Sequence, residues 1–294
     1  MLPRDLIRQI RRLHIRARRA VEDLLGGNYK SIFKGAGIAF EEVREYQPGD
    51  DIRTIDWNVT ARMGHAFVKR FIEERELTVF LVIDCSRSLL FGTREKQKRD
   101  IAAEMAALLA FCAISNNDKV GLILCSDRVE KYVPPRKGTR HVLRLIRDIL
   151  FFEPQQAGTC LRTGLDYLNK VLHRRAIVFL ISDFLDTDYE KSFQQTGKRH
   201  DLVALVLSDP RELALPSIGL LELQDAETDR TLLIDTSCPE FQAALGQKSA
   251  ARAEALRQLA RSARIDLIDV STDGNHLDSL TRFFRLRQRR LGHS

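Results

Sequence analysis

The sequence predicts an α/β fold in which helices flank a mostly parallel sheet. Nearly continuous apolar runs, each as long as a buried strand, alternate with segments of helical periodicity. Three of these runs, 77–84, 176–183 and 201–209, end in an acidic residue. Ligands of open α/β sheets bind at the carboxyl ends of strands, so these acids mark the edge where a site is expected.

Residues 1–76 are expected to form an extension packed on the core. Apolar residues spaced three or four apart over 5–25 predict an amphipathic helix, which the Gly-Gly-Asn sequence at 26–28 ends. Glycines, charges and short apolar alternations over 31–76 predict short strands and loops. A turn is expected at 47–50, where the sequence is Gln-Pro-Gly-Asp.

Residues 77–294 are expected to form the α/β domain. Its strands are predicted, in chain order, at 77–84, 119–126, 129–135, 176–183, 201–209 and 264–272. Its helices are predicted at about 95–115, 141–152, 161–173, about 238–263 and 276–290. A hairpin insertion is expected over 220–236, with the polar residues 225–229 at its turn.

The composition is that of a folded protein with a core. The 294 residues carry 47 Lys and Arg against 40 Asp and Glu, a formal net charge of +7, and 44% of them are hydrophobic. This apolar fraction excludes a disordered chain. No apolar run reaches the roughly 18 residues of a membrane-spanning helix, and the first residues lack the apolar segment of a signal peptide. We therefore expect a cytoplasmic protein.

The positive charge is concentrated at the two ends. Residues 1–24 hold seven Arg and three acids, and residues 281–294 hold five Arg and no acid, which leaves a nearly neutral body. Such ends can bind nucleic acid phosphates or anionic lipid, and this is our second functional hypothesis. The helical spacing of the apolar residues in 1–24 favours a solvated helix face instead. In the last helix, Phe283 and Phe284 are expected to pack inward.

The five cysteines predict neither a zinc site nor a disulfide framework. They form no C-x-x-C pair and no Cys/His spacing typical of zinc. An odd number without a framework is typical of a reducing compartment. Cys85 and Cys160 lie in two loops of the metal site predicted below, where packed thiols are favoured over a redox pair.

One set of oxygen-bearing residues predicts a metal site. Asp84, Ser86 and Ser88 form a D-x-S-x-S loop at the end of a predicted strand, and alternate positions of an extended loop point the same way. Thr159 lies just before a predicted helix and Asp183 ends another strand. A set of carboxylates and hydroxyls suits Mg²⁺ or Mn²⁺ rather than zinc.

The chemistry of this set favours binding over catalysis. Two carboxylates and three hydroxyls leave a divalent ion incompletely neutralised, with one position open to an Asp or Glu of a partner. Hydrolysis by a metal-bound water is the third hypothesis, and it needs a general base. His65, His173 and His200 are scattered along the chain, so we predict a protein that is not an enzyme.

These five residues resemble the metal-ion-dependent adhesion site of von Willebrand factor A domains. Asp84, Ser86 and Ser88 match its first motif, Thr159 its second and Asp183 its third, in the right order. The resemblance implies a von Willebrand factor A-like, Rossmann-like fold. It also implies that the metal recognises a protein ligand.

A second resemblance covers about residues 25–290. Residues 37–76, which run directly into the strand that begins at 77, resemble the signature of bacterial proteins with the domain of unknown function 58. The hairpin at 220–236 and the Arg-rich end fit that family. The resemblance implies a MoxR-type AAA+ ATPase as partner and a chaperone-like or assembly role. Some members have amino-terminal membrane helices, and because none is predicted here, a cytosolic version is implied.

The signature is also rich in charged residues around Trp57, and two interpretations remain open. One is a structural ion-pair network that covers an edge of the sheet. The other is a surface for a partner, in which Trp57 and Arg62 are typical anchor residues. Its acidic candidates are Asp50, Asp51 and Asp56.

Overall fold

The computed structural model describes residues 39–72, 76–93, 96–154, 158–224, 230–274 and 276–292. They belong to two compact units, one that contains Thr78–Ser294 and one formed by Phe33–Leu77. The helix predicted over 5–25 lies outside the described residues. The expected packing of residues 1–76 on the core stays a prediction.

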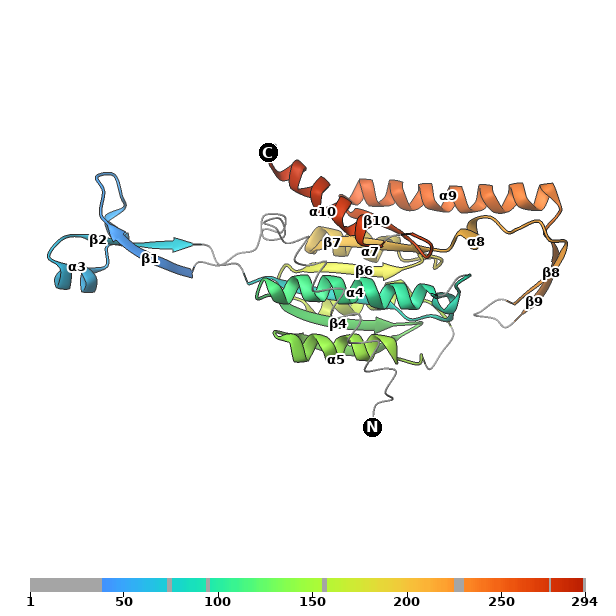
Figure 1. The fold of residues 1–294 in the computed structure, drawn as a ribbon, viewed down its shortest axis with the longest axis horizontal. Helices are drawn as coiled ribbons and strands as arrows, with labels where there is room; N and C mark the ends of the chain where they lie inside the picture. The colour runs from blue at the N-terminus through green and yellow to red at the C-terminus, as the bar shows by residue number, and fades with distance from the viewer. Residues whose placement is uncertain are drawn as a thin grey trace. The chain divides into compact units, whose positions relative to one another are not determined.

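A six-stranded sheet forms the centre of the larger unit (Figure 1). Its strands are β3 (Thr78–Asp84), β4 (Lys119–Cys125), β5 (Val129–Arg136), β6 (Ile177–Ser182), β7 (Asp201–Ser208) and β10 (Asp266–Ser271). The spatial order is β10-β7-β6-β3-β4-β5, and every neighbouring pair is parallel except β4 and β5. This is the order of doubly wound α/β sheets, so the predicted fold class is confirmed.

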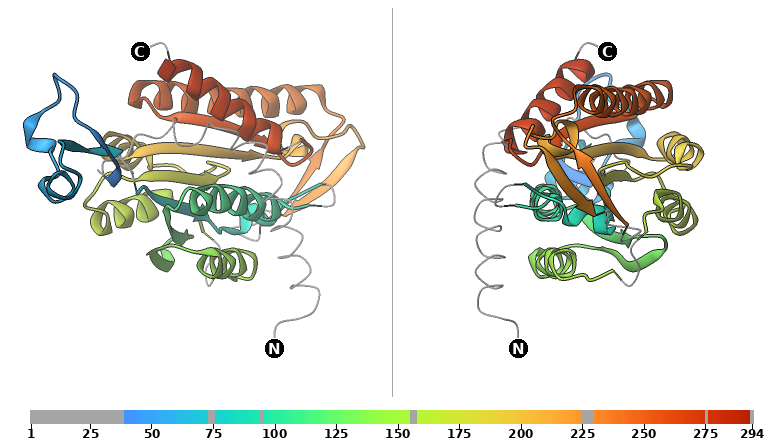
Figure 2. Two further views of the ribbon diagram at one scale, coloured as in Figure 1. Left: turned by 60° about the vertical axis from the view of Figure 1, so that its left-hand side comes forward. Right: turned by 90° about the vertical axis from the view of Figure 1, so that its right-hand side faces the viewer.

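The helices of this unit lie on both faces of the sheet. They are α4 (Lys98–Ser115), α5 (Thr139–Leu150), α6 (Leu161–Val171), α7 (Glu190–Arg199), α8 (Pro210–Leu213), α9 (Pro239–Ala263) and α10 (His276–Gly292). Leu165 of α6, Phe193 of α7 and Leu256 of α9 share one hydrophobic cluster with β3, β4, β6 and β7. Helices α4 and α5 pack against each other on the opposite face (Figure 2).

Burial on both faces explains why the central strands read as apolar runs. All six residues of β6 are buried, as are six of the seven in β3. The close packing also explains Gly121 in β4, since a Cβ there would lie 2.6 Å from the ring of Phe80. A glycine at this position makes room for a large buried ring on the neighbouring strand.

The smaller unit is built on an antiparallel hairpin. It contains β1 (Ala39–Glu45), the 3₁₀ helix η1 (Ile52–Thr54), α3 (Trp57–Met63) and β2 (Phe67–Ile72). The Asp51 side chain accepts a hydrogen bond from the backbone N–H of Arg53 and so caps η1. Asp56 caps α3 in the same way, and Gly64 ends α3 with a φ of 79°. The short strands and loops predicted for this region are present.

Five elements were not predicted. They are the helices α3, α7 and α8 and the 3₁₀ helices η1 and η2 (Arg87–Leu90). Only three residues of α7 are buried, so its apolar periodicity is weak, and the other four elements have seven residues or fewer. The predicted hairpin is present as β8 (Leu220–Gln224) and β9 (Thr231–Asp235), and its turn at 225–229 lies outside the described residues. No described helix has the length and apolar character needed to cross a membrane.

The buried imidazole of His200 makes stability depend on pH. Its Nδ1 accepts a hydrogen bond from the backbone N–H of Ala176 at 3.3 Å, and burial, with Arg199 and Arg175 nearby, lowers its pKa to about 4. The unfolded chain takes up this proton near pH 6.5, so stability is retained above that pH and is lost as the pH falls toward 4.

Substitution of His200 is expected to make the fold less sensitive to acid. Between pH 7 and pH 4.5, the free energy of unfolding of His200→Gln should fall by up to about 3 kcal/mol less than that of the wild type. Urea unfolding at the two pH values measures the difference.

The exposed His173 provides the matched control, because His173→Gln changes the same chemical group without changing a buried one. If wild type and His200→Gln lose the same free energy of unfolding between the two pH values, His200 is not the acid-sensitive group.

Candidate metal centre at the carboxyl end of the sheet

Two of the predicted site residues, Asp84 and Asp183, lie where the winding of the sheet reverses. Strands β3 and β6 are neighbours at the centre of the sheet, and Asp84 ends β3 while Asp183 follows β6. Connections leave these two strands in opposite directions, which is where open α/β sheets bind ligands. Asp84 and Asp183 lie close enough for the charge of one to affect the pKa of the other.

The loop after β3 brings three oxygen-bearing groups together. The backbone N–H of Ser86 donates to Oδ1 of Asp84 at 2.8 Å, which turns the loop back toward the carboxylate. The hydroxyl oxygens of Ser86 and Ser88 lie 2.9 Å apart. The two hydroxyls therefore converge, but Ser86 is the N-cap residue of η2 and Ser88 lies within it. A 3₁₀ turn, and not the extended loop expected from the sequence, brings them together.

Asp84 is a buried carboxylate with polar but uncharged partners. Its exposed fraction is 1%, and its Oδ2 accepts a hydrogen bond from the hydroxyl of Ser182 at 2.7 Å. Burial and the nearby charge of Asp183 raise the pKa of Asp84 to about 7, against the opposing effect of its hydrogen bonds. Among the described residues, no basic side chain contacts Asp84. A cation placed beside it would remove this electrostatic cost.

Lys98 supplies a positive charge on the other side of the site. This side chain, at the start of α4, is 0% exposed, and its Nζ donates to Oδ2 of Asp183 at 2.7 Å and to Oε1 of Glu212 at 2.6 Å. Burial alone lowers the pKa of Lys98, but the two carboxylates outweigh it and raise the pKa above the ordinary value. The ammonium group therefore stays charged and balances one of its two acidic partners.

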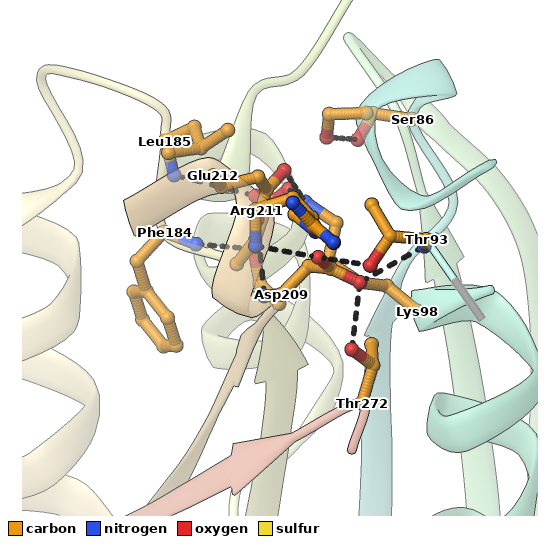
Figure 3. A network of polar contacts seen from close by, with 12 residues as sticks. Ser86, Thr93, Lys98, Phe184, Leu185, Asp209, Arg211, Glu212 and Thr272 are labelled. Carbon is orange, nitrogen blue, oxygen red and sulfur yellow. Dashed lines mark hydrogen bonds and ion pairs between the residues drawn. The ribbon is translucent and has the colours of Figure 1, made fainter. Parts of the chain in front are cut away.

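A buried aspartate holds Glu212 in this position. Asp209 and Glu212 form a capping box at the start of α8. The Asp209 side chain accepts a hydrogen bond from the backbone N–H of Glu212, and the Glu212 side chain accepts one from the backbone N–H of Asp209. Asp209 also accepts hydrogen bonds from the hydroxyls of Thr93 at 2.8 Å and Thr272 at 2.7 Å (Figure 3). Burial alone raises the pKa of Asp209, but these bonds outweigh it and lower the pKa. Asp209 thus joins the loops after η2, β7 and β10.

Thr159 lies at the same edge of the sheet, one strand away from Asp84. The adjacent residue, Cys160, donates its backbone N–H to the carbonyl of Ser126, which directly follows β4. Strand β4 pairs with β3, and Cys125 at its end is the register partner of Asp84. The loop before α6 is therefore attached to the strand next to the candidate site.

The residues present fit a hard divalent cation on the Asp84 side. No group of three or more His, Cys, Asp and Glu side chains among the described residues has an arrangement suited to a metal, so an ion here must use hydroxyls. Asp84, Ser86 and Ser88 offer one carboxylate and two converging hydroxyls. Asp183 contributes a second carboxylate. Its Oδ1 accepts a hydrogen bond from the Leu185 N–H and its Oδ2 accepts one from Lys98, which fixes the orientation of the group. The remaining lone pairs of the carboxylate can accept hydrogen bonds from water bound to an ion.

Sequence reasoning missed Lys98 and Glu212, although both left a signal. Lys98 lies at helical spacing from Ile101 and Met105, which are buried, so a charged residue occupies the buried face of α4. The D-x-x-E spacing of Asp209 and Glu212 is typical of a capping box. Neither signal reveals that the two side chains meet.

The three acidic candidates of the smaller unit all have partners within that unit. Asp50 forms an ion pair with Arg44, which lowers the pKa of Asp50, but Asp51 and Asp56 cap helices through backbone N–H groups. Trp57 is 66% exposed and Arg62 is also exposed. The acids are therefore engaged by the local fold, while the two anchor-type side chains lie on the surface.

The thiol of Cys85, next to Asp84, is packed against the end of β4. Burial, with the charge of Asp84 nearby, raises the pKa of Cys85, and its Sγ donates to the carbonyl of Cys125 at 3.0 Å. A thiol with a raised pKa carries little thiolate and reacts slowly. This environment favours a structural role over a redox role for Cys85.

Comparisons with known proteins give a family match. The family described as "Protein of unknown function DUF58" matches residues 42–255. The uncharacterized protein Rv1480 of Mycobacterium tuberculosis is 32% identical over 285 residues, which cover 95% of this chain and 89% of that protein. The crystal structure of the conserved hypothetical protein BatB from Bacteroides thetaiotaomicron aligns with a TM-score of 0.47 at 14% identity, over 74% of this chain and 100% of that chain. The SpRpn10 VWA domain aligns with a TM-score of 0.45 at 12% identity, over 70% of this chain and 94% of that chain.

Removal of the Lys98 charge is expected to destabilise the larger unit. Lys98→Met leaves the buried Asp183 and the partly buried Glu212 without a cation, and breaking a buried ion pair from one side costs about 3–5 kcal/mol. Lys96→Met is the matched control, since Lys96 is 38% exposed in its ion pair with Glu104 and such pairs contribute less than about 1 kcal/mol. Urea unfolding in EDTA measures both losses.

Combining Lys98→Met with Asp183→Asn and Glu212→Gln is expected to recover most of the lost stability, because no uncompensated charge then remains in the cluster. Equal destabilisation by Lys98→Met and Lys96→Met would show that the buried ion pairs do not stabilise the fold.

Proposed function

The chain belongs to the DUF58 family, and from this membership and the site at the end of β3 we propose that it is a non-enzymatic, divalent-metal-binding module for protein–protein interaction. One observation carries the proposal. The buried carboxylate of Asp84, whose pKa is raised by burial, lies in a loop with the converging hydroxyls of Ser86 and Ser88. Such a site gains stability from a cation with a preference for oxygen.

Each residue of the site has a defined part in this proposal. Asp84, Ser86 and Ser88 hold a Mg²⁺ or Mn²⁺ ion, and Thr159 and Asp183 complete the oxygen-bearing side of the site, as in a metal-ion-dependent adhesion site. The bound ion supplies a positive charge and a coordination position that accepts a carboxylate of a partner protein. Ser182 holds Asp84 in place through Oδ2, and Lys98 holds Asp183.

The positions of His65, His200 and His276 support binding rather than hydrolysis. His200 lies at the end of α7 and His276 at the start of α10, and burial lowers the pKa of both. His65 is paired with Glu45 in the smaller unit. A metal-dependent hydrolase needs a general base beside the substrate, and none of these side chains bonds to Asp84 or Asp183.

We propose a MoxR-type AAA+ ATPase as the partner class, with a chaperone-like or assembly role. This part rests on the family resemblance alone. The exposed Trp57 and Arg62 of the smaller unit provide a second contact in this proposal, because Trp and Arg are the residue types that most often anchor interfaces.

Nucleic-acid or anionic-surface binding through the Arg-rich ends has less support. Arg287 forms ion pairs with Asp201 and Asp266, and Arg290 with Asp266. Phe283 and Phe284 of the same helix are buried, as expected. These contacts give α10 a structural role, and residues 1–24 lie outside the described part of the chain.

Mg²⁺ is expected to raise the melting temperature of the wild type and not that of Asp84→Ala. A ligand that binds only the folded state, present at about 100 times its Kd, adds about 2.7 kcal/mol of stability. Asp188→Ala is the matched control, because Asp188 is an exposed acid in the loop after β6. Melting curves with MgCl₂ and with EDTA measure the effect. Identical curves for the wild type in both solutions would contradict the metal site.

The partner contact is tested separately with Ser86→Ala, which keeps both carboxylates. A MoxR-type ATPase from the same genome is expected to bind the immobilised wild type in Mg²⁺ and to lose most of that binding with Ser86→Ala or EDTA. Binding that is equal in all three cases would contradict recognition through the metal, even if the ion itself is bound.

A further inference from the structure

The outer edge of the central sheet lies in a groove between two helices. Strand β10 is the last strand in the sheet order and pairs with β7 on one side, and no other described strand pairs with it. A cavity of about 540 Å³ is lined by Ile265–Asp269 together with α9 and α10. Both views of Figure 2 place α9 and α10 at this edge of the sheet.

Consecutive residues of β10 line the groove, which shows that the backbone edge of the strand faces it. Side chains of successive strand residues alternate between the two faces of a sheet, so a cavity over one face touches every second residue. Helices α9 and α10 line the cavity together with four consecutive residues of the strand, 266–269, so the groove follows this part of the strand edge. Such an edge carries N–H and C=O groups available to an added strand.

The walls of the groove are strongly basic. Six arginines line it against two acids; they are Arg257, Arg261, Arg264, Arg282, Arg287 and Arg290, and the acids are Asp266 and Asp269. Arg287 and Arg290 form ion pairs with Asp266. Nη2 of Arg257 lies 3.9 Å from Oδ2 of Asp269. Within the described part of the chain, Arg261, Arg264 and Arg282 form no ion pair and are exposed.

The groove also offers apolar contacts. Leu286 of α10 is 48% exposed at the cavity, next to Leu267 of β10 and the ring of Phe283. A ligand that fits this groove therefore combines a backbone with hydrogen-bonding groups, negative charges and apolar side chains.

We propose that the edge of β10 binds an extended, acidic peptide of a partner protein as an added strand. The backbone of the peptide pairs with β10, its acidic side chains face Arg261, Arg264 and Arg282, and its alternate apolar side chains contact Leu286. The six residues of β10 span about 20 Å and pair with a segment of similar length. Phosphates accept hydrogen bonds but donate none, so the backbone of a nucleic acid cannot pair with both the N–H and the C=O groups of the strand edge.

The probe is a fluorescein-labelled octapeptide of alternating Glu and Val, titrated with the full chain in EDTA and followed by fluorescence anisotropy. EDTA makes the result independent of the metal proposal. We expect saturable binding that weakens at least tenfold in Arg261→Glu/Arg264→Glu and in Arg282→Glu. Arg140→Glu, an exposed site on α5, is the matched control and is expected to leave binding unchanged. Melting curves confirm that each variant is folded.

Three further probes separate strand addition from simple charge attraction. A Lys-Val octapeptide is expected not to bind, and the Glu-Val octapeptide methylated at alternate backbone nitrogens is expected to lose binding, because methylation removes the donors of one edge. Absence of saturable binding by the unmodified peptide overturns the proposal. Equal binding of the methylated and the unmodified peptide also overturns it. The same holds if a single-stranded oligonucleotide displaces the unmodified peptide, binds more tightly than it and depends on the same arginines.

Discussion

The buried ammonium group of Lys98 connects most of the carboxyl end of the sheet. It reaches from α4 to Asp183 after β6 and to Glu212 in α8, and Glu212 is held through its capping box with Asp209. Asp209 continues the connection to Thr93 and Thr272. A buried charge persists only where its partners are complete, so these loops are fixed relative to one another by the requirement that every carboxylate in the cluster be paired or hydrogen-bonded.

Local sequence was sufficient for the parts of the structure that depend on local rules. The buried strands are apolar runs in the sequence, whereas the contact between Ser86 and Ser88 forms in the 3₁₀ helix η2, which the sequence pattern did not predict. The pairing of Lys98 with Glu212 joins residues 114 positions apart, and no local pattern specifies that α8 lies against the start of α4. Helix α7 was missed because packing from α6 and α9, rather than its own periodicity, places it.

The fold shows which of the basic residues near the carboxyl-terminal end form ion pairs and which do not. Arg287 attaches α10 to both β7 and β10 through Asp201 and Asp266, so part of the charge at the carboxyl-terminal end is used inside the larger unit. Three further arginines, Arg261, Arg264 and Arg282, line the edge of the sheet without an ion pair among the described residues. The negative site at the strand ends and the basic groove at the strand edge therefore attract opposite kinds of ligand.

Lys98 is part of the chain, so its charge stays beside Asp183 whatever ions the solution contains. A tethered ammonium has a fixed local concentration, so the neutralisation of Asp183 does not vary with the ions in solution. Asp84 has no such resident partner among the described residues, and a proton or a dissolved cation must supply its counter-charge. The chain itself thus supplies the counter-charge of Asp183, whereas the counter-charge of Asp84 has to come from the solution.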